Sequence, residues 1–282
     1  MIFREYKIET VKFFLLFLFS SIILAGCKED PAQTEENIDP DALKILFVGN
    51  SYMDVNNLPF TFKGFGDNSG KKLFIGADIV LGTKLEDHVK SAATYSLVGS
   101  VKWDYIILQG DPAPTAYPET EHLIFPDHTK HDEFFALKTM RDYIKVICTN
   151  AKIVYIMPWA YEDGLLWITG QTDTYEDMQK KIYDNTLKWC KDLDLIVAPV
   201  GWAWYDVMKE NRQIHYLFQD DYNHPGQRGT YITASVLYST IYRRSTEGIP
   251  FYSGLASDEA KYFQQKSSKL VLDSLPLWNN DN

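Results

Sequence analysis

The chain has few cysteines and no concentration of positive charge. Three cysteines occur among 282 residues, which is too few for a small domain held together by many disulfides. Lysine and arginine number 28 against 38 aspartate and glutamate residues, giving a net charge of -10. Such a chain repels phosphate backbones, and no Lys/Arg cluster makes a local exception, so nucleic acid is not an expected partner.

The sequence also lacks an apolar run long enough to cross a membrane comfortably, which needs about 20 residues. The charge-free stretch from Phe13 to Ala25 is shorter, and it follows three basic residues in the layout of a secretory signal peptide. The next residues complete Leu24-Ala25-Gly26-Cys27, which resembles a bacterial lipobox. This resemblance implies that residues 1–26 are removed and that a lipid on Cys27 is the protein's only membrane contact.

Residues 27–41 are polar, acidic and contain two prolines, a composition typical of a flexible tether. The run Lys28-Glu29-Asp30 resembles the short export signal of Bacteroidetes lipoproteins. The resemblance implies an outer membrane lipoprotein exposed on the cell surface, with a periplasm-facing anchor as the second interpretation.

The remainder, residues 42–282, has the composition of one globular domain. Hydrophobic residues make up 45% and aromatic residues 15% of the chain, enough apolar material to form a sizeable core. Cys148 and Cys190 form either one disulfide or two buried thiols, and thiols are favoured because free cysteine packs as a small hydrophobe.

Short β-rich runs alternate with segments of helical spacing along this domain. Most of the runs are almost wholly apolar, as in strands buried on both faces. The alternation predicts an α/β fold with a five-stranded parallel sheet and helices on both faces, whose ligand site lies at the carboxyl ends of the strands. The expected strands are Ile45 to Val48, Leu73 to Val80, Tyr105 to Leu108, Ile153 to Met157 and Leu195 to Val200, and the expected helices include Pro59 to Gly66, Phe134 to Cys148, Tyr175 to Leu193 and Thr230 to Arg243.

Two loops carry candidate catalytic residues. The first strand ends in Gly49-Asn50-Ser51-Tyr52, where backbone N–H groups can face a substrate oxyanion, although such a tetrapeptide alone is more typical of a turn. Far along the chain, Asp221 and His224 are separated by two residues. One loop can therefore bring the carboxylate to Nδ1–H of the imidazole and leave Nε2 free as a base for a serine.

Together these loops resemble the first and fifth sequence blocks of the SGNH/GDSL hydrolases. The match consists of Gly-x-Ser after the first strand and Asp-x-x-His-Pro before the last long helix, over roughly Leu43 to Tyr242. It implies a flavodoxin-like three-layer α/β/α sandwich with Ser51 as nucleophile, His224 as general base and Asp221 as its orienting carboxylate, working without cofactor or metal. The distance from Ser51 Oγ to His224 Nε2 is then expected near 3 Å, roughly hydrogen-bond length.

The oxyanion hole follows from the same resemblance. Its donors are expected to be the N–H groups of Ser51 and Gly82 and the side chain of Gln109, which stands where the family commonly has asparagine. Gly76 is an alternative to Gly82, but it lies inside the second strand and is more typical of a packing glycine. Asn50 replaces the family's usual aspartate, and its amide can still brace the loop.

Aromatic clusters follow the fourth and fifth strands, on the side expected to hold the site. They indicate a platform for sugar rings or acyl groups, with Asn50, Tyr52, Trp159 and Trp202 as candidate substrate-binding residues. We therefore predict an esterase acting on acetylated polysaccharide through an acyl-enzyme, with a lipase or lysophospholipase, or a catalytically weakened glycan-binding surface lipoprotein, as alternatives. A weaker metal-binding candidate is the group Asp127, His128, His131 and Asp132.

Overall fold

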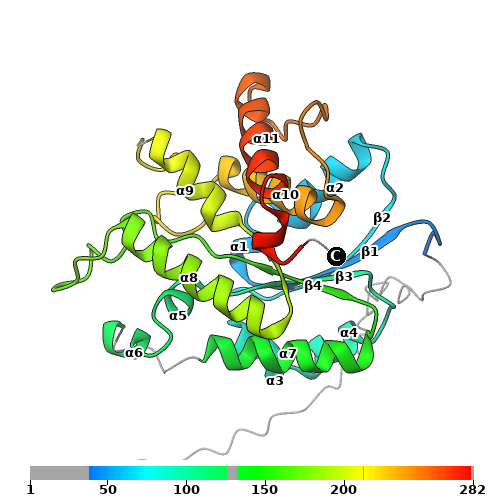
Figure 1. Cartoon of the computed structure of the whole chain (residues 1–282), viewed down its shortest axis with the longest axis horizontal. Helices are drawn as coiled ribbons and strands as arrows, with labels where there is room; N and C mark the ends of the chain where they lie inside the picture. Colours follow the sequence, from blue (N-terminus) through cyan, green and yellow to red (C-terminus); the bar gives the residue numbers. More distant parts are fainter. Residues whose placement is uncertain (1–37, 126–131, 212, 281–282) are drawn as a thin grey trace, which may run out of the picture. The chain divides into compact units, whose positions relative to one another are not determined.

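Five parallel strands form one sheet in the order β2-β1-β3-β4-β5 (Figure 1). The protein is represented by a computed structural model, which describes residues 38–125, 132–211 and 213–280. The predicted α/β class and five-stranded parallel sheet are confirmed. The strands are β1 (Leu43–Gly49), β2 (Leu73–Ile79), β3 (Tyr105–Gln109), β4 (Lys152–Ile156) and β5 (Ile196–Ala198).

Helices cover both faces of the sheet and complete a three-layer sandwich. Helices α2, α9, α10 and α11 lie on one face, and α3, α4, α7 and α8 lie on the other (Figure 1). The bounds are α1 (Ser51–Asp54), α2 (Leu58–Asn68), α3 (Leu85–Lys90), α4 (Ala92–Val98), α5 (Pro112–Ala116), α6 (Glu121–Ile124), α7 (Glu133–Ile147), α8 (Tyr175–Leu193), α9 (Val200–Glu210), α10 (Gln227–Tyr242), α11 (Ser257–Leu272) and the 3₁₀ helix η2 (Leu275–Trp278).

The strand order places a topological switch point between β1 and β3. The chain leaves β1 toward β2 on one side and returns to build β3, β4 and β5 on the other. Loops that leave the carboxyl ends of β1 and β3 therefore diverge, which opens the crevice where ligands bind in open parallel sheets. Ser51 follows β1 at this crevice.

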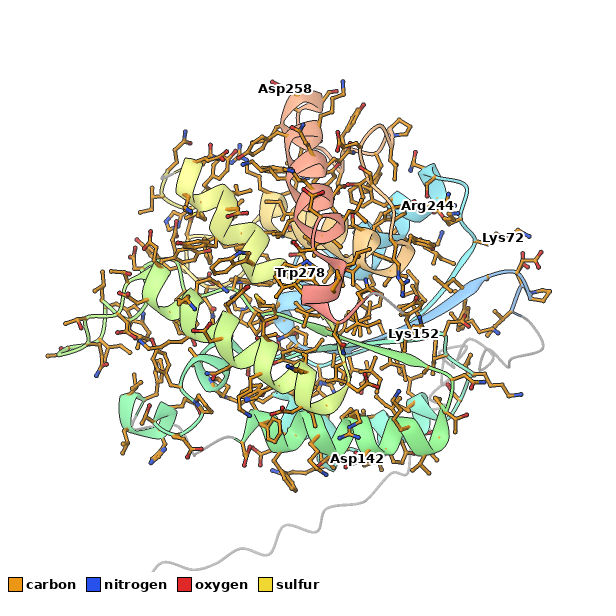
Figure 2. All side chains as sticks on the ribbon, viewed as in Figure 1. Lys72, Asp142, Lys152, Arg244, Asp258 and Trp278 are labelled. Atoms are coloured by element: carbon orange, nitrogen blue, oxygen red, sulfur yellow. The ribbon has the colours of Figure 1, made fainter. Side chains whose placement is uncertain are left out.

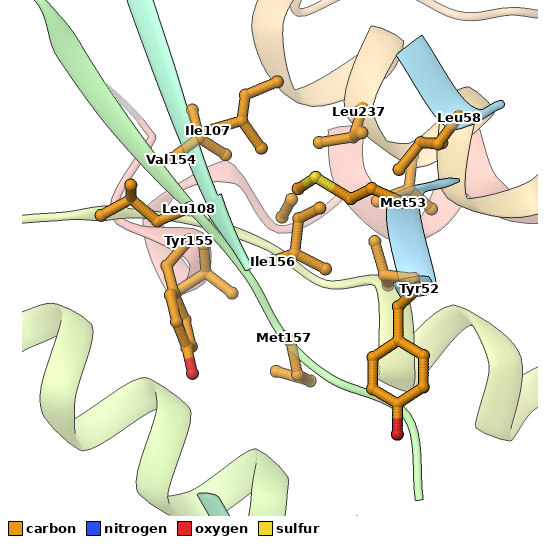
Figure 3. Packing of buried hydrophobic residues seen from close by; sticks show 14 of the residues in the cluster. Tyr52, Met53, Leu58, Ile107, Leu108, Val154, Tyr155, Ile156, Met157 and Leu237 are labelled. Atoms are coloured by element: carbon orange, nitrogen blue, oxygen red, sulfur yellow. The ribbon is translucent and has the colours of Figure 1, made fainter. Parts of the chain in front are cut away.

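A continuous apolar core anchors the turn that carries Ser51. Met53 in α1 is fully buried and points toward Leu58 and Leu237, while the hydroxyl of Tyr52 points away from this cluster (Figure 3). Labelled charged side chains such as Asp142 and Asp258 lie at the periphery of the molecule (Figure 2). Packing of Met53 thus fixes the backbone on which the candidate nucleophile stands.

The two cysteines of the domain do not form a disulfide. Cys148 and Cys190 are free and buried, as favoured, and burial raises the pKa of the Cys190 thiol.

Strand β5 is shorter than predicted because Pro199 follows it and Val200 already begins α9. The signal peptide, Cys27 and most of the tether lie outside the described residues. Within the part of the chain that the structure describes, no helix is both long and apolar enough to span a membrane.

Candidate active site

The backbone before Ser51 is held by three neighbouring segments. The carbonyl of Gly49 accepts hydrogen bonds from Val80 N (3.1 Å) and from His88 Nε2 (3.0 Å). The N–H of Asn50 donates to Gln109 Oε1 at 3.0 Å. A loop fixed on both sides of one peptide unit keeps the following residue in one position, which a nucleophile requires.

The side chain of Asn50 ties the same loop to the loops after β2 and β3. Its Nδ2 donates to the carbonyl of Thr83 (2.8 Å) and to Asp111 Oδ1 (2.9 Å). Its Oδ1 accepts from Tyr52 N at 3.1 Å and so caps α1. The predicted bracing by Asn50 is present, and its amide is fully engaged, so it shapes the cleft and has no N–H left to offer a substrate.

His88 holds the loop of Ser51 from the protein interior. It is buried, and while Nε2 donates to Gly49, Nδ1 lies 3.1 Å from Asp78 Oδ2 and 3.2 Å from Thr94 Oγ1. Thr94 donates to the same carboxylate oxygen at 2.5 Å. The role of His88 was not predicted, because its main partner is a backbone carbonyl, which sequence motifs do not reveal.

The two candidate loops meet at the carboxyl ends of the strands. Ser51 Oγ lies 2.8 Å from His224 Nε2, as expected, and His224 Nδ1 lies 2.6 Å from Asp221 Oδ2. The other carboxylate oxygen of Asp221 accepts from the backbone N–H groups of His224 (2.9 Å) and Asn223 (3.0 Å). A single aspartate therefore orients the imidazole and shapes the turn that carries it.

The loop that carries His224 forms a small hairpin, which backbone hydrogen bonds close. An antiparallel bridge pairs Phe218 with Pro225, and Gln219 N donates to the carbonyl of His224 at 2.9 Å. Burial raises the pKa of Asp221, but the hydrogen bonds from His224 and Asn223 outweigh it and leave this pKa below its ordinary value. The carboxylate is therefore charged at neutral pH and can stabilise an imidazolium.

Aromatic side chains support the imidazole from the core side. The edge of the Tyr52 ring meets His224 at a centroid distance of 5.2 Å, and Tyr52 OH donates to Asn223 Oδ1 at 2.5 Å. Burial raises the pKa of Tyr52 well above its usual range, so the phenol keeps the proton that it donates. Trp159 Nε1 donates to the carbonyl of Asn223 at 3.0 Å, which fixes the residue before the histidine.

Two predicted substrate-binding residues are placed elsewhere by the structure. Trp159 is only 3% exposed and stacks on Trp204 at 4.3 Å, because the chain after β4 turns into the interior. Trp202 lies on α9 and packs against Tyr183 of α8 at 4.2 Å, away from the cleft. The prediction that these two tryptophans contact substrate is wrong, and Trp159 instead supports the imidazole loop.

The predicted side-chain donor to the oxyanion is also absent from the cleft. Gln109 is 3% exposed, its Oε1 accepts from Asn50 N, and its Nε2 donates to the carbonyl of Gly110 at 2.7 Å. The stem of glutamine, longer than that of asparagine, allows the amide to fold back onto its own strand end. The assignment of Gln109 to the oxyanion hole is therefore wrong, and this side chain clamps the loop of Ser51.

Ser51 and Gly82, the residues with the two predicted backbone donors, both line the cleft. Ser51 is the first residue of α1, so its N–H has no acceptor within the helix. Gly82 lines the same cleft and has a φ of +72°, a left-handed conformation that glycine adopts freely. The alternative Gly76 lies inside β2, where an added Cβ would come within 2.5 Å of the Trp103 ring, so it is a packing glycine.

The cleft around the triad has a volume of about 170 Å³, and its walls combine apolar surface with charged and amide side chains. Lys84 enters it and lies 3.3 Å from Glu121 Oε1 and 4.0 Å from Asp111 Oδ2, which balances its charge. The lining residues are Asn50, Ser51, Tyr52, Gly82, Thr83, Lys84, Asp111, Ala113, Pro114, Tyr161, Asn223 and His224.

A second hollow of about 190 Å³ lies at the opposite ends of the strands, beside Lys152 and Asp194. It contains no serine or histidine, so the chemistry belongs to the cleft.

The candidate metal group lies largely outside the described residues. Of its four members only Asp132 is described, and its side chain caps α7 by accepting from Phe135 N at 2.8 Å. In residues 38–125, 132–211 and 213–280, no group of three His, Cys, Asp or Glu side chains is arranged to hold a metal ion.

Solved structures of other proteins share this architecture. A DUF4886 family protein from Bacteroides uniformis aligns with a TM-score of 0.65 and 18% identity, over 82% of this chain and 95% of its own. A protein assigned to the SGNH hydrolases from Slackia heliotrinireducens gives 0.55 and 19%, over 70% and 98%. A protein assigned to the GDSL-like lipases from Parabacteroides merdae gives 0.53 and 16%, over 72% and 96%.

The site has the geometry of a Ser-His-Asp triad on an open parallel sheet. The shared architecture shows that the fold is that of the SGNH hydrolases, as the sequence blocks indicated. Neither protein-family models nor curated proteins give a match to the sequence.

Proposed function

We propose that the protein is a serine ester hydrolase that works through an acyl-enzyme. The observation that carries the proposal is the 2.8 Å contact between Ser51 Oγ and His224 Nε2, with Asp221 held against the far side of the imidazole. A hydroxyl must lose its proton as it attacks, and an oriented imidazole at this distance accepts it.

The reaction follows from the positions of these groups. Ser51 Oγ attacks the ester carbonyl, its proton passes to His224 Nε2, and the negative carbonyl oxygen meets the N–H groups of Ser51 and Gly82. His224 then gives the proton to the departing alcohol, which leaves an acyl group on Ser51. Water, deprotonated by the same imidazole, attacks the acyl carbonyl; the bond from the acyl carbon to Ser51 Oγ then breaks, His224 returns the proton to Oγ, and the acid is released. Each preorganised donor of this kind contributes about 3–4 kcal/mol to the barrier reduction.

We further propose that the acyl group is acetyl and that the alcohol is a glycan. The cleft is small and its walls include charged and amide side chains, which suits a short acyl group. A long acyl chain needs an extended apolar groove, and burying it against Lys84 and Asp111 would remove charged groups from water at a high cost. The lipase alternative is therefore not favoured.

Hydrolysis of p-nitrophenyl acetate by the wild type and by Ser51→Ala tests this function. The variant is expected to lose about 10³-fold or more in kcat, and Ser100→Ala, which alters an exposed serine, serves as the matched control. Equal rates for wild type and Ser51→Ala would overturn the proposal and leave the glycan-binding alternative. Preference for p-nitrophenyl dodecanoate over the acetate would overturn the acetyl assignment alone.

For localisation, we propose that Cys27 is lipidated and anchors the protein in the outer membrane, facing the cell exterior. The lipobox-like sequence and the acidic segment after it support this proposal. Metabolic labelling with radioactive palmitate is expected to mark the wild type and not Cys27→Ser. Protease treatment of intact cells is expected to remove the protein, and protection until the outer membrane is opened would indicate the periplasm-facing anchor.

A further inference from the structure

A further hollow, distinct from the one beside Lys152, adjoins the cleft and shares two of its lining residues. Tyr161 and Asn223 line both spaces, and Asn223 directly precedes His224, the candidate general base. One molecule can therefore place an ester at Ser51 and a second group in the hollow. The volume is about 280 Å³, just below the range of about 300–1,000 Å³ typical of sites for drug-sized ligands, so it suits one ring-sized group. Its walls are Phe125, Tyr161, Trp167, Asp221, Tyr222 and Asn223.

The hollow presents an indole ring that is fixed in place and exposed. Trp167 is 62% exposed, yet its Nε1 donates to the carbonyl of Gly164 at 3.1 Å, and its ring lies 5.9 Å from that of Phe125 and 6.4 Å from that of Tyr161. An indole face that is held in place beside a cleft gives a ring-shaped ligand a surface on which to stack. The fixed orientation also lowers the conformational entropy that a ligand would lose on binding to it.

Close contacts and backbone hydrogen bonds also hold the loop that carries Trp167. Gly164 has a φ of +60°, and a Cβ there would lie 2.3 Å from the backbone of Thr174, so the loop packs directly on the start of α8. Leu165 N donates to the carbonyl of Asp173 at 2.8 Å. Glu162 N donates to the carbonyl of Tyr222 at 2.9 Å and connects this loop to the loop of His224. The walls of the hollow therefore keep their positions relative to the triad.

The charge of the hollow selects among possible ligands. Asp221 lines it and Asp220 follows in the adjoining hollow, and among the residues that the structure describes none that lines the hollow is basic. An anionic sugar or a phosphate headgroup would be repelled by these carboxylates. An acyl chain would bury a carboxylate against hydrocarbon, which is costly. A neutral sugar ring offers an apolar face for the indole and hydroxyls for the carboxylate and amide oxygens.

We infer that this hollow is a binding subsite for a neutral sugar residue of the substrate, stacked on Trp167. The inference rests on the proposed esterase function, because the sugar is the alcohol part of the ester that reaches Ser51. The enzyme accordingly discriminates between neutral acetylated glycans and glycans that carry uronic acids.

The test compares Trp167→Ala and Trp167→Tyr with the matched control Leu166→Ala, which removes a neighbouring exposed side chain that does not line the hollow. The substrates are acetylated xylotriose, acetylated trigalacturonate and p-nitrophenyl acetate, and thermal melting confirms that each variant folds. In Trp167→Ala the ratio of kcat/KM for acetylated xylotriose to that for p-nitrophenyl acetate is expected to fall about tenfold, mainly through KM. Trp167→Tyr is expected to restore most of the ratio, and Leu166→Ala to leave it unchanged.

Two kinetic results would overturn the subsite: an unchanged ratio in Trp167→Ala, or equal hydrolysis of the neutral and the anionic trisaccharide esters by the wild type. Absence of hydrolysis on all three esters would refute the esterase function instead. Calorimetry with unacetylated xylotriose and the Ser51→Ala protein then decides the subsite separately. Binding about tenfold weaker when Trp167→Ala is added supports it, and equal or absent binding overturns it.

Discussion

His88 offers a way to separate positioning of the nucleophile from simple support of the fold. Its Nε2 donates to the carbonyl of Gly49, two residues before Ser51, whereas its Nδ1 faces Asp78. His88→Gln keeps an N–H near the place of Nε2, and His88→Asn keeps one near the place of Nδ1. The two variants therefore each remove one of the two contacts while retaining a buried amide of similar size.

The expected magnitudes follow from those contacts. Loss of one buried hydrogen bond costs about 1–2 kcal/mol of unfolding free energy, which lowers Tm by roughly 2–8 °C in a domain of this size. Both variants should show such a loss. Gly49 keeps its bond from Val80, so the loop persists in His88→Asn but loosens, and a displaced nucleophile is expected to lower kcat by about tenfold. His88→Gln should retain kcat within about threefold.

The assay is hydrolysis of p-nitrophenyl acetate at least about 15 °C below the lower Tm, a margin set by the expected shift. Thr94→Val is the control, because it removes the hydroxyl that contacts Asp78 and His88 Nδ1 and leaves the contact between His88 Nε2 and Gly49 in place. It is expected to lower Tm and leave kcat unchanged. If kcat instead follows Tm across all three variants, or if His88→Gln is the slower of the His88 pair, then the Gly49 contact does not position Ser51.

Three further outcomes are expected. Asp221→Asn still accepts the backbone N–H groups but no longer fixes the imidazole tautomer, so kcat for p-nitrophenyl acetate should fall by about 10³–10⁴ with little change in Tm, and a loss below tenfold would contradict the triad. Burial and the charge of Asp111 raise the pKa of Glu133 well above 4.5, so the folded protein holds a proton that the unfolded chain releases. The contribution of Glu133 to stability is then greatest below about pH 4.5 and declines by about 1.4 kcal/mol per pH unit as pH rises toward the folded pKa; Glu133→Gln should remove this contribution in urea unfolding, and a gap between the two proteins that is constant from pH 5 to 8 would refute the assignment. Gly201→Ala places a Cβ 2.0 Å from the backbone carbonyl of Pro158 and should lower Tm by at least about 4 °C, whereas an unchanged Tm would show that this contact relaxes freely.

The strands and the long helices α7, α8 and α10 were predictable because their burial leaves an apolar pattern in the sequence. Helix α11 was not predicted, since part of its buried face is polar. Gln264 and Ser268 are fully or nearly fully buried and bond to partners such as Thr246, so the helix shows little hydrophobic periodicity. Helix α9 was not recognised because the aromatic residues after β5 were interpreted as a loop at the site.

The triad was predictable because its logic depends on residue type and spacing in two loops. The directions of side chains were not. Gln109 and Trp159 follow strands that point at the site, yet both side chains turn inward to bond the loops of Ser51 and His224. His88 had one available signal, its three-residue spacing from the buried Leu85, which places it on the inner face of α3.

The closed loop from Phe218 to Pro225 has a consequence for how activity responds to movement. Asp221 and His224 belong to the same small hairpin, so these two side chains move together when the hairpin moves. Ser51 lies on another turn, which Gln109 and His88 hold by hydrogen bonds to its backbone. A ligand that contacts the hairpin through Tyr222 or Asn223 can therefore change the distance between the imidazole and the serine hydroxyl, and the hydrogen bond from Tyr52 to Asn223 passes part of that displacement to the turn of Ser51.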